Sequence, residues 1–213
     1  MSKKKHNKSE SEERLVLTLR PDDAGGFARA WALALHDGFL LRVPGAMSVM
    51  DLLTEFVGLD ASYVDDRIRA IFLDGHPVDD LDAAPVGNGN ELSLSSAMPG
   101  VAGITMGRNN AIAVYREGIT FQCDGDCDER AGLIRVRLFN FIARETAPQF
   151  MALGVGLDGR GWQRVVHDAP AEFWSCVVQA KLDGVAVSTD VLSTLPPPEE
   201  GCVRFLQIIN GGK

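Results

Sequence analysis

Apolar and polar residues alternate in several short runs along the chain, which is the pattern of half-buried strands. The clearest runs are "RLVLTLR" (residues 14–20), "FLLRV" (39–43), "LIRVRLFNF" (133–141) and "CVRFLQII" (202–209). Their lengths are usual for strands in globular proteins. The pattern therefore predicts a strand at each of these four places.

Two further stretches are built alike around the tripeptide Leu-Asp-Gly. They are "IRAIFLDGHPVDD" (68–80) and "VVQAKLDGVAVS" (177–188). Asp-Gly is a strong signal for a tight turn between two antiparallel strands. A polar loop, an alternating strand and a glycine-containing segment follow each stretch. We interpret the two stretches as copies of one supersecondary unit.

Helical spacing is clearest in "SVMDLLTEFVGLD" (48–60). Its apolar side chains recur three and four residues apart, so they share one face of a helix. Ser48 is a suitable N-cap, and Gly58 suits the position just beyond the last turn. A second helix is predicted within "DDAGGFARAWALALHDG" (22–38), and one or two short helices within 161–184.

Proline and glycine mark the expected breaks between elements. Pro148 is expected to end the run that starts with strand 133–141, and Pro170 to interrupt the helices that follow. "AIAVYREGITFQC" (111–123) is predicted to form a hairpin between the two halves. The glycine-rich "LGVGLDGRG" (153–161) is interpreted as lacking the strand–turn–helix framing of a dinucleotide-binding loop.

The order of these elements predicts an α+β protein with two small domains in tandem. Residues 1–13, basic and then acidic with almost nothing apolar, are predicted to be a disordered leader. The first domain is placed at 14–103 and the second at 131–213. Residues 104–130, which include the predicted hairpin, would link them.

Composition narrows the range of partners and compartments. The chain of 213 residues carries a net charge of −8, which disfavours general binding of nucleic acid because phosphate contacts need clustered cations. No apolar run reaches the roughly 18 residues of a membrane-spanning helix. The first residues do not have the apolar core of a secretory signal, so we expect a cytoplasmic protein.

Four cysteines are too few for a disulfide scaffold in a chain of this length. Cys123 and Cys127 stand close together in the acidic stretch "CDGDCDE". Two thiolates at this spacing provide half of a zinc site, and the other ligands would come from elsewhere. An acidic surface turn and a redox pair are the alternatives for this stretch.

The second half resembles the β-grasp sulfur carriers, namely the small subunit of molybdopterin synthase and the sulfur carrier of thiazole synthesis. "IRVRLFNFIARE" is similar to the opening strand of the former, "AKLDGVAVS" to the strand and turn of both, and "EEGCVRFLQIINGG" to their ending. The likeness covers about residues 133–212 and, more weakly, 14–103. It implies two tandem β-grasp (ubiquitin-like) domains, each with a mixed sheet packed against a helix.

The same resemblance implies a chemistry at the end of the chain. The carboxyl group of Gly212 would be adenylated by an E1-type enzyme, then converted to a thiocarboxylate or conjugated. Gly211 and Gly212 would pass through a narrow channel because they have no side chains. The family ends at its paired glycines, so Lys213 would first be removed by a peptidase.

The carrier itself would be neither an enzyme nor the holder of a cofactor. Its partners would be the activating enzyme and the peptidase. An alternative interpretation is a non-catalytic β-grasp module that binds a protein partner through its sheet and has an inert tail. A third is a protein that binds metal or a small molecule through the pair Cys123 and Cys127. The sequence leaves open the pathway, the oligomeric state and the role of the first domain.

Overall fold

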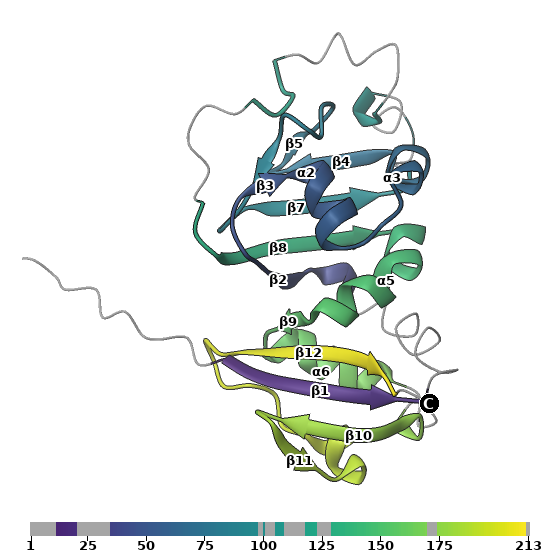
Figure 1. Ribbon diagram of the computed structural model, residues 1–213, viewed down its shortest axis with the longest axis vertical. Coiled ribbons are helices and arrows are strands. Elements are labelled where there is room, and N and C mark those ends of the chain that lie inside the picture. The colour runs from purple at the N-terminus through teal and green to yellow at the C-terminus, as the bar shows by residue number, and fades with distance from the viewer. Residues whose placement is uncertain are drawn as a thin grey trace, which may run out of the picture.

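The computed structural model describes residues 12–20, 35–97, 100, 105–108, 118–122, 129–169 and 174–211. These residues form an α+β protein, as predicted, with one large mixed sheet of ten strands and few helices (Figure 1). The strand order is β11-β10-β1-β12-β9-β2-β8-β7-β4-β5, and a separate small ladder pairs β3 with β6.

Most strands lie where alternation or a Leu-Asp-Gly turn predicts them. The strands are β1 (Glu12–Leu19), β2 (Phe39–Val43), β3 (Met47–Ser48), β4 (Ala70–Leu73), β5 (His76–Pro77), β6 (Pro85–Val86), β7 (Glu91–Ser95), β8 (Gly132–Phe139), β9 (Val155–Leu157), β10 (Val177–Leu182), β11 (Val185–Val187) and β12 (Val203–Asn210).

The helical elements are fewer and mostly short. They are α2 (Val49–Asp51), the π-helical turn η2 (Leu52–Phe56), α3 (Ala61–Arg67), α5 (Phe141–Leu153), α6 (Gly159–Asp168) and the 3₁₀ segment η4 (Thr189–Thr194). The predicted helix caps are confirmed, since Ser48 Oγ accepts the amide of Asp51 at 3.0 Å and Gly58 has φ +80°.

The ten strands fall into two groups of five with the same pattern of directions. In the first, which we call the N-terminal unit, the order β2-β8-β7-β4-β5 is antiparallel, parallel, antiparallel, antiparallel. In the second, the C-terminal unit, β9-β12-β1-β10-β11 repeats these directions. An antiparallel pairing of β2 with β9 joins the two units into one sheet.

The two Leu-Asp-Gly turns show which strands are equivalent. Asp74 and Asp183 have φ of 50° and 49°, and each precedes a glycine with φ of 82°. The amide of Asp74 donates to the carbonyl of Glu91 in β7 at 2.9 Å, and its carboxylate accepts the amide of Glu91 at 2.7 Å. Asp183 makes the same two bonds with Arg14 in β1, at 2.8 and 2.7 Å. In the C-terminal unit β1 therefore occupies the place of β7.

This pairing crosses the predicted division of the chain. Strand β1, assigned to the domain 14–103, lies in the C-terminal unit, whereas β8, assigned to the domain 131–213, lies in the N-terminal unit. The two sheet units are therefore not two consecutive stretches of sequence. The division into domains at 104–130 stays a prediction, but the sheet does not follow it.

The join between the units is symmetric and crowded. Leu40 of β2 lies directly opposite Gly156 of β9, and these two positions are equivalent in their units. A Cβ atom on Gly156 would lie 3.0 Å from side-chain atoms of Leu40, Val203 and Phe205. These three side chains already fill the place that a side chain of residue 156 would take, which accounts for glycine at this position.

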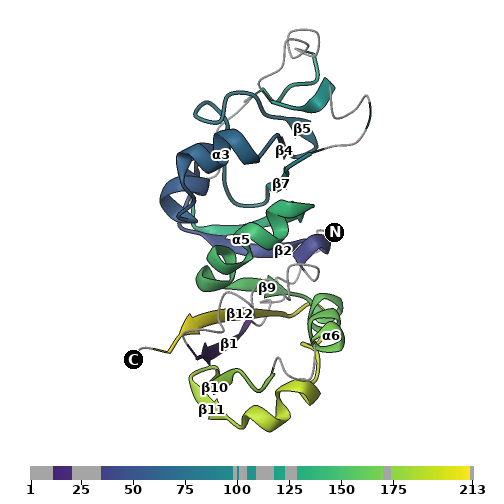
Figure 2. The same cartoon turned by 90° about the vertical axis from the view of Figure 1, so that its right-hand side faces the viewer.

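The helices of the N-terminal unit and those of the C-terminal unit lie on opposite sides of the molecule. Figures 1 and 2 show α2 and α3 on one side of the N-terminal unit and α6 on the other side of the molecule, against the C-terminal unit. The right-handed twist of strands, accumulated over the sheet, accounts for this change of side. Helix α5 lies at the join, where Phe150 meets Phe39 edge to face at 5.4 Å and Gln207 Nε2 donates to the carbonyl of Ala152 at 2.7 Å.

Two predicted boundaries are wrong. The leader predicted at 1–13 extends too far, because β1 already begins at Glu12. Pro148 does not end the run, because it lies inside α5 and only removes a donor to the preceding turn. Most of the helix predicted at 22–38 and of the hairpin predicted at 111–123 lies outside the described residues, as does Pro170.

An ionic cluster fastens α3 to α5. Both carboxylate oxygens of Glu145 accept hydrogen bonds from Arg67, and Tyr63 donates to one of them at 2.8 Å. The Arg67 hydrogen bond holds the pKa of Glu145 below its usual range. Burial, and then the hydrogen bond to Glu145, raise the pKa of Tyr63.

Replacing Glu145 by Gln should lower stability most at neutral pH. A lowered carboxyl pKa stabilises the folded state above the unfolded pKa of about 4.3, and this contribution is lost as the pH falls through the folded pKa. Because Glu145 is one-third exposed, solvent screening limits the loss to about 1 kcal/mol. Urea unfolding at pH 7 and pH 3 measures it, with the exposed Glu55→Gln as control. An equal loss at both pH values would contradict the ionic origin.

Gly156→Ala should destabilise the join between the units. The added Cβ would press on three side chains at once, which costs about 1–2 kcal/mol, as overpacking of a core does. Gly118→Ala is the matched control, since a Cβ there meets nothing within 4 Å. Thermal unfolding of both variants measures the difference. Equal melting temperatures would show that the join adapts freely.

Candidate functional site

The predicted activation tail begins inside the sheet. The amide of Gly211 donates to the carbonyl of Leu19 at 2.8 Å, which extends the parallel ladder of β12 and β1 by one residue. A Cβ on Gly211 would lie 2.9 Å from that same carbonyl oxygen. Gly212 and Lys213 lie outside the described residues. The first glycine of the pair thus has a structural reason to be small, namely its contact with β1.

The predicted cysteine pair is not placed. Cys123 and Cys127 lie outside the described residues. Among the residues that the structure does describe, no three His, Cys, Asp or Glu side chains gather as metal ligands. Zinc, a redox pair and an acidic turn all stay open for the stretch 123–128.

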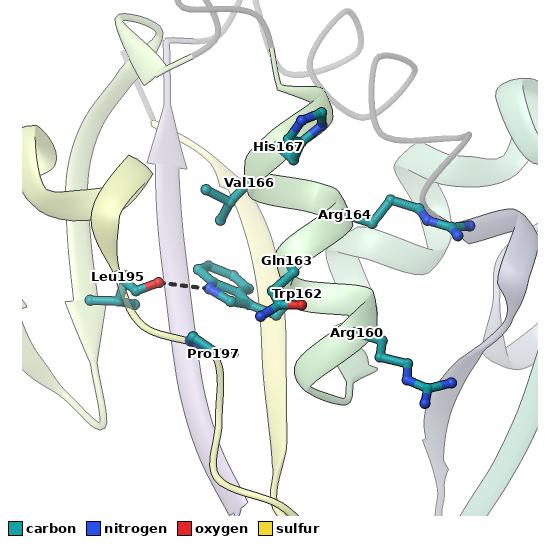
Figure 3. A pocket seen from close by; sticks show the side chains of 8 residues that line it. All are labelled: Arg160, Trp162, Gln163, Arg164, Val166, His167, Leu195 and Pro197. Atoms are coloured by element: carbon teal, nitrogen blue, oxygen red, sulfur yellow. Dashed lines mark hydrogen bonds between the residues drawn. The ribbon is translucent and has the colours of Figure 1, made fainter.

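A groove of about 630 Å³ lies on the surface of the C-terminal unit. It lies between α6 and the loop that follows η4 (Figure 3). Its lining residues come from these two segments and are Arg160, Trp162, Gln163, Arg164, Val166, His167, Leu195 and Pro197. A volume of this size suits a small molecule or a few side chains of a protein.

Trp162 holds the two walls of the groove together. It is only 1% exposed, and its indole Nε1–H donates to the carbonyl of Leu195 at 3.0 Å, as Figure 3 shows. A buried indole requires such an acceptor. The helix wall and the loop wall are therefore fixed relative to each other, and the groove does not depend on a mobile side chain.

Beneath Trp162 lies a buried ionic cluster. The guanidinium of Arg204, which is 3% exposed, lies 4.5 Å from the indole ring. Its Nε donates to Glu13 at 2.8 Å, and its Nη1 donates to the carbonyl of Pro196 at 2.8 Å. Strands β1 and β12, α6 and the proline loop meet in this one cluster. The groove therefore forms only when β1 is in place.

The positive charges of α6 do not converge on the apolar part of the groove. In Figure 3, Trp162 and Val166 point toward Leu195 and Pro197, while Arg160 and Arg164 extend away to the other side of the helix. Arg164 is paired with Asp37. The apolar floor and walls are thus suited to hydrophobic side chains of a ligand rather than to a phosphate or another anion.

The glycine-rich stretch 153–161 has a strand and a helix around it, which the sequence did not predict. Strand β9 runs directly into α6, so a strand–helix framing exists, and the sequence interpretation was wrong on this point. However, both neighbours of β9 are antiparallel to it, unlike the parallel strands of a dinucleotide-binding unit. Asp158 also caps the helix, accepting the amide of Gly161 at 2.8 Å, and its negative charge opposes a phosphate there.

The sequence pointed to only part of this site. Tryptophan is usually buried, as Trp162 is, and nothing in the sequence marked it as part of a groove. Arg204 and Glu13 were missed because each sits in an ordinary alternating strand. One signal was present: Arg204 falls on the inward-facing positions of its strand, where a charge needs a partner.

Arg204→Met should destabilise the protein by about 2–3 kcal/mol, because it leaves Glu13 partly buried without its cation. The double variant with Glu13→Gln should recover part of this loss, since it removes the orphaned charge as well. Chemical unfolding of the two single variants and the double variant gives the coupling between them. Additive losses would show that the pair does not act as one unit.

No family model matches this chain, and the comparisons with curated proteins and with solved structures also found no match. Among the described residues, no helix is long and apolar enough to span a membrane.

Proposed function

We propose that the protein is a non-catalytic interaction module of two β-grasp-like units, whose C-terminal unit binds a protein partner. Each unit has five strands that include one parallel pair, and helices lie against it (Figure 1), an arrangement that supports this proposal. The units differ from a simple tandem repeat in that β1 and β8 are exchanged between the two halves of the chain.

The position of Gly211 is the observation that carries this proposal. Its amide is bonded to Leu19, so the ordered ladder reaches the very residue that would enter an activating enzyme. Consecutive Cα atoms are about 3.8 Å apart, so position 212 starts one residue beyond the sheet. Adenylation at Gly212 would require the end of β12 to separate from β1 first.

The groove on α6 supports binding of a protein side chain. Its walls are joined by the hydrogen bond between Trp162 and Leu195, so the site is rigid before a partner arrives. Preorganised apolar pockets that accept an anchor side chain are typical of protein interfaces. Gln163 and His167 lie exposed at its margin and can give such a partner hydrogen bonds.

The carrier function stays the competing proposal. The resemblance over 133–212 favours it, and it needs both the removal of Lys213 and the release of Gly211 from Leu19. Binding through the groove needs neither. A substitution at Gly212 should therefore change the interaction with a partner if the protein is a carrier, and leave it unchanged if the protein is a binding module.

A photo-crosslinking amino acid placed at position 163, in place of Gln163, distinguishes the carrier from the binding module. In cells of the source organism we expect one discrete adduct that persists with Gly212→Ala and is lost with Pro197→Asp, an exposed change in the groove wall. A crosslinker at Glu55, on the other unit, is the matched control and should not give this adduct. Loss of the adduct with Gly212→Ala would contradict the module.

The intact mass of the protein from the same cells provides the second measurement. The module predicts that the end of the chain carries no sulfur. A species that ends at Gly212 with one carboxyl oxygen replaced by sulfur would establish the carrier instead.

A further inference from the structure

The two edge strands of the ten-stranded sheet differ in whether another described segment lies against them. At one edge, β5 contains Pro77, and the segment 118–122 lies against it: the amide of Phe121 donates to the carbonyl of Pro77 at 2.8 Å. At the other edge, β11 pairs only with β10, and no backbone hydrogen bond from another described segment reaches it. β11 is therefore the open edge of the described sheet.

β11 lacks the usual protection of an open edge apart from its short length. Its sequence is Val185-Ala186-Val187, with no charge, no proline and a regular register against β10. Natural edge strands commonly carry lysine, proline or a bulge to prevent pairing with another chain. Val185 is 68% exposed, the most exposed large apolar side chain among the described residues.

Both valines point to the side of the sheet that carries the core. Val185 lies opposite Leu182, which lies opposite Leu15, and Val187 is connected in the same way through Ala180 to Leu17. Leu15 and Leu17 are 0% exposed. The hydrophobic layer of the C-terminal unit therefore extends to β11, where no other described strand continues it.

The N-terminal unit shows what a covered edge looks like. Val78 occupies the position equivalent to Val187, counted from the matching Asp-Gly turns, and it is only 2% exposed. The segment that contains Phe121 lies beside it and packs against the core. Among the described residues, no backbone hydrogen bond brings a comparable segment to Val187, which remains partly exposed.

We propose that the edge of β11 pairs antiparallel with β11 of a second copy of this chain, which continues the sheet and its core across a two-fold axis at Ala186. About this axis each valine meets a valine, so the strand is complementary to itself, as an isologous interface requires. Val185 of one copy then faces Val187 of the other, so four valines cover one another.

The charges that face each other in this register and the existing join between the two units both support this arrangement. In that register Gly184 faces Ser188 and Asp183 faces Thr189 of the partner copy, so no like charges are opposed. The molecule already joins its own two units in this way, through antiparallel edge strands about Leu40 and Gly156. Because β11 is short, the interface is small and the dimer is expected to be weak, of micromolar affinity or less.

Sedimentation velocity over a series of rising protein concentrations, up to the high micromolar range, tests the proposal. Wild type should shift from monomer toward dimer as concentration rises. Val185→Lys places a charge among the four valines and should keep the protein monomeric at every concentration. Ile119→Lys, at an exposed apolar residue of the opposite edge, is the matched control and should dimerise as wild type does.

Ala186→Cys provides a measurement that does not depend on affinity alone. The two copies of this side chain face each other across the axis, within reach of a disulfide. Mild oxidation should give a crosslinked dimer, whereas Val191→Cys, exposed but outside β11, should not.

A wild type that stays monomeric at all concentrations, or a dimer unaffected by Val185→Lys, would overturn the proposal. A monomer would leave β11 open to a strand of a different protein. The proposal is independent of the groove and the tail, so its failure leaves the crosslinking and mass results on the proposed function unchanged.

Discussion

The parallel pairing of β1 with β12 is the contact on which the C-terminal unit depends. It brings eight residues from one end of the described chain against eight from the other, and β10 then pairs with the free side of β1. Leu15, Leu17 and Leu19 supply the inward side chains of the central strand and are fully buried. Without β1 the unit would be split into two parts, with β12 and β10 no longer joined.

The same contact assembles the groove. Glu13 is on β1 and Arg204 is on β12, so the ion pair between them exists only when the strands are paired. The guanidinium of Arg204 lies against the ring of Trp162 and is held there by the hydrogen bond that it donates to the carbonyl of Pro196. The groove is thus supported by a long-range strand pairing, because its lining residues lie between 160 and 197 whereas Glu13 comes from the other end of the described chain.

Pairing with β1 also changes the meaning of the terminal glycines. Gly211 is small because the carbonyl of Leu19 lies where a side chain would be, a sufficient structural reason for one glycine of the pair. The pairing of β2 with β9 gives the molecule one continuous sheet with two unequal edges. The edge at β5 is closed by the chain itself, whereas the edge at β11 is left for another molecule.

The sequence by itself determined the local elements, because their causes are local. Alternation set the strands, Ser48 capped its helix, and the two Asp-Gly pairs formed turns with nearly the same φ angles. The likeness of the two halves was also correctly visible in these turns.

Only the tertiary structure decided which strands are neighbours. Alternation shows that one face of a strand is buried but not against which partner. The sequence therefore grouped β1 with the strands of the first half and β8 with those of the second, whereas the sheet pairs each of them with strands of the other half. The hydrogen bonds of Asp183 could go to any extended strand, and the fold gives them to Arg14 rather than to a nearby residue. The buried ion pair of Arg204 with Glu13 and the central place of β1 between β12 and β10 follow from that choice, because they join residues that are far apart in the sequence.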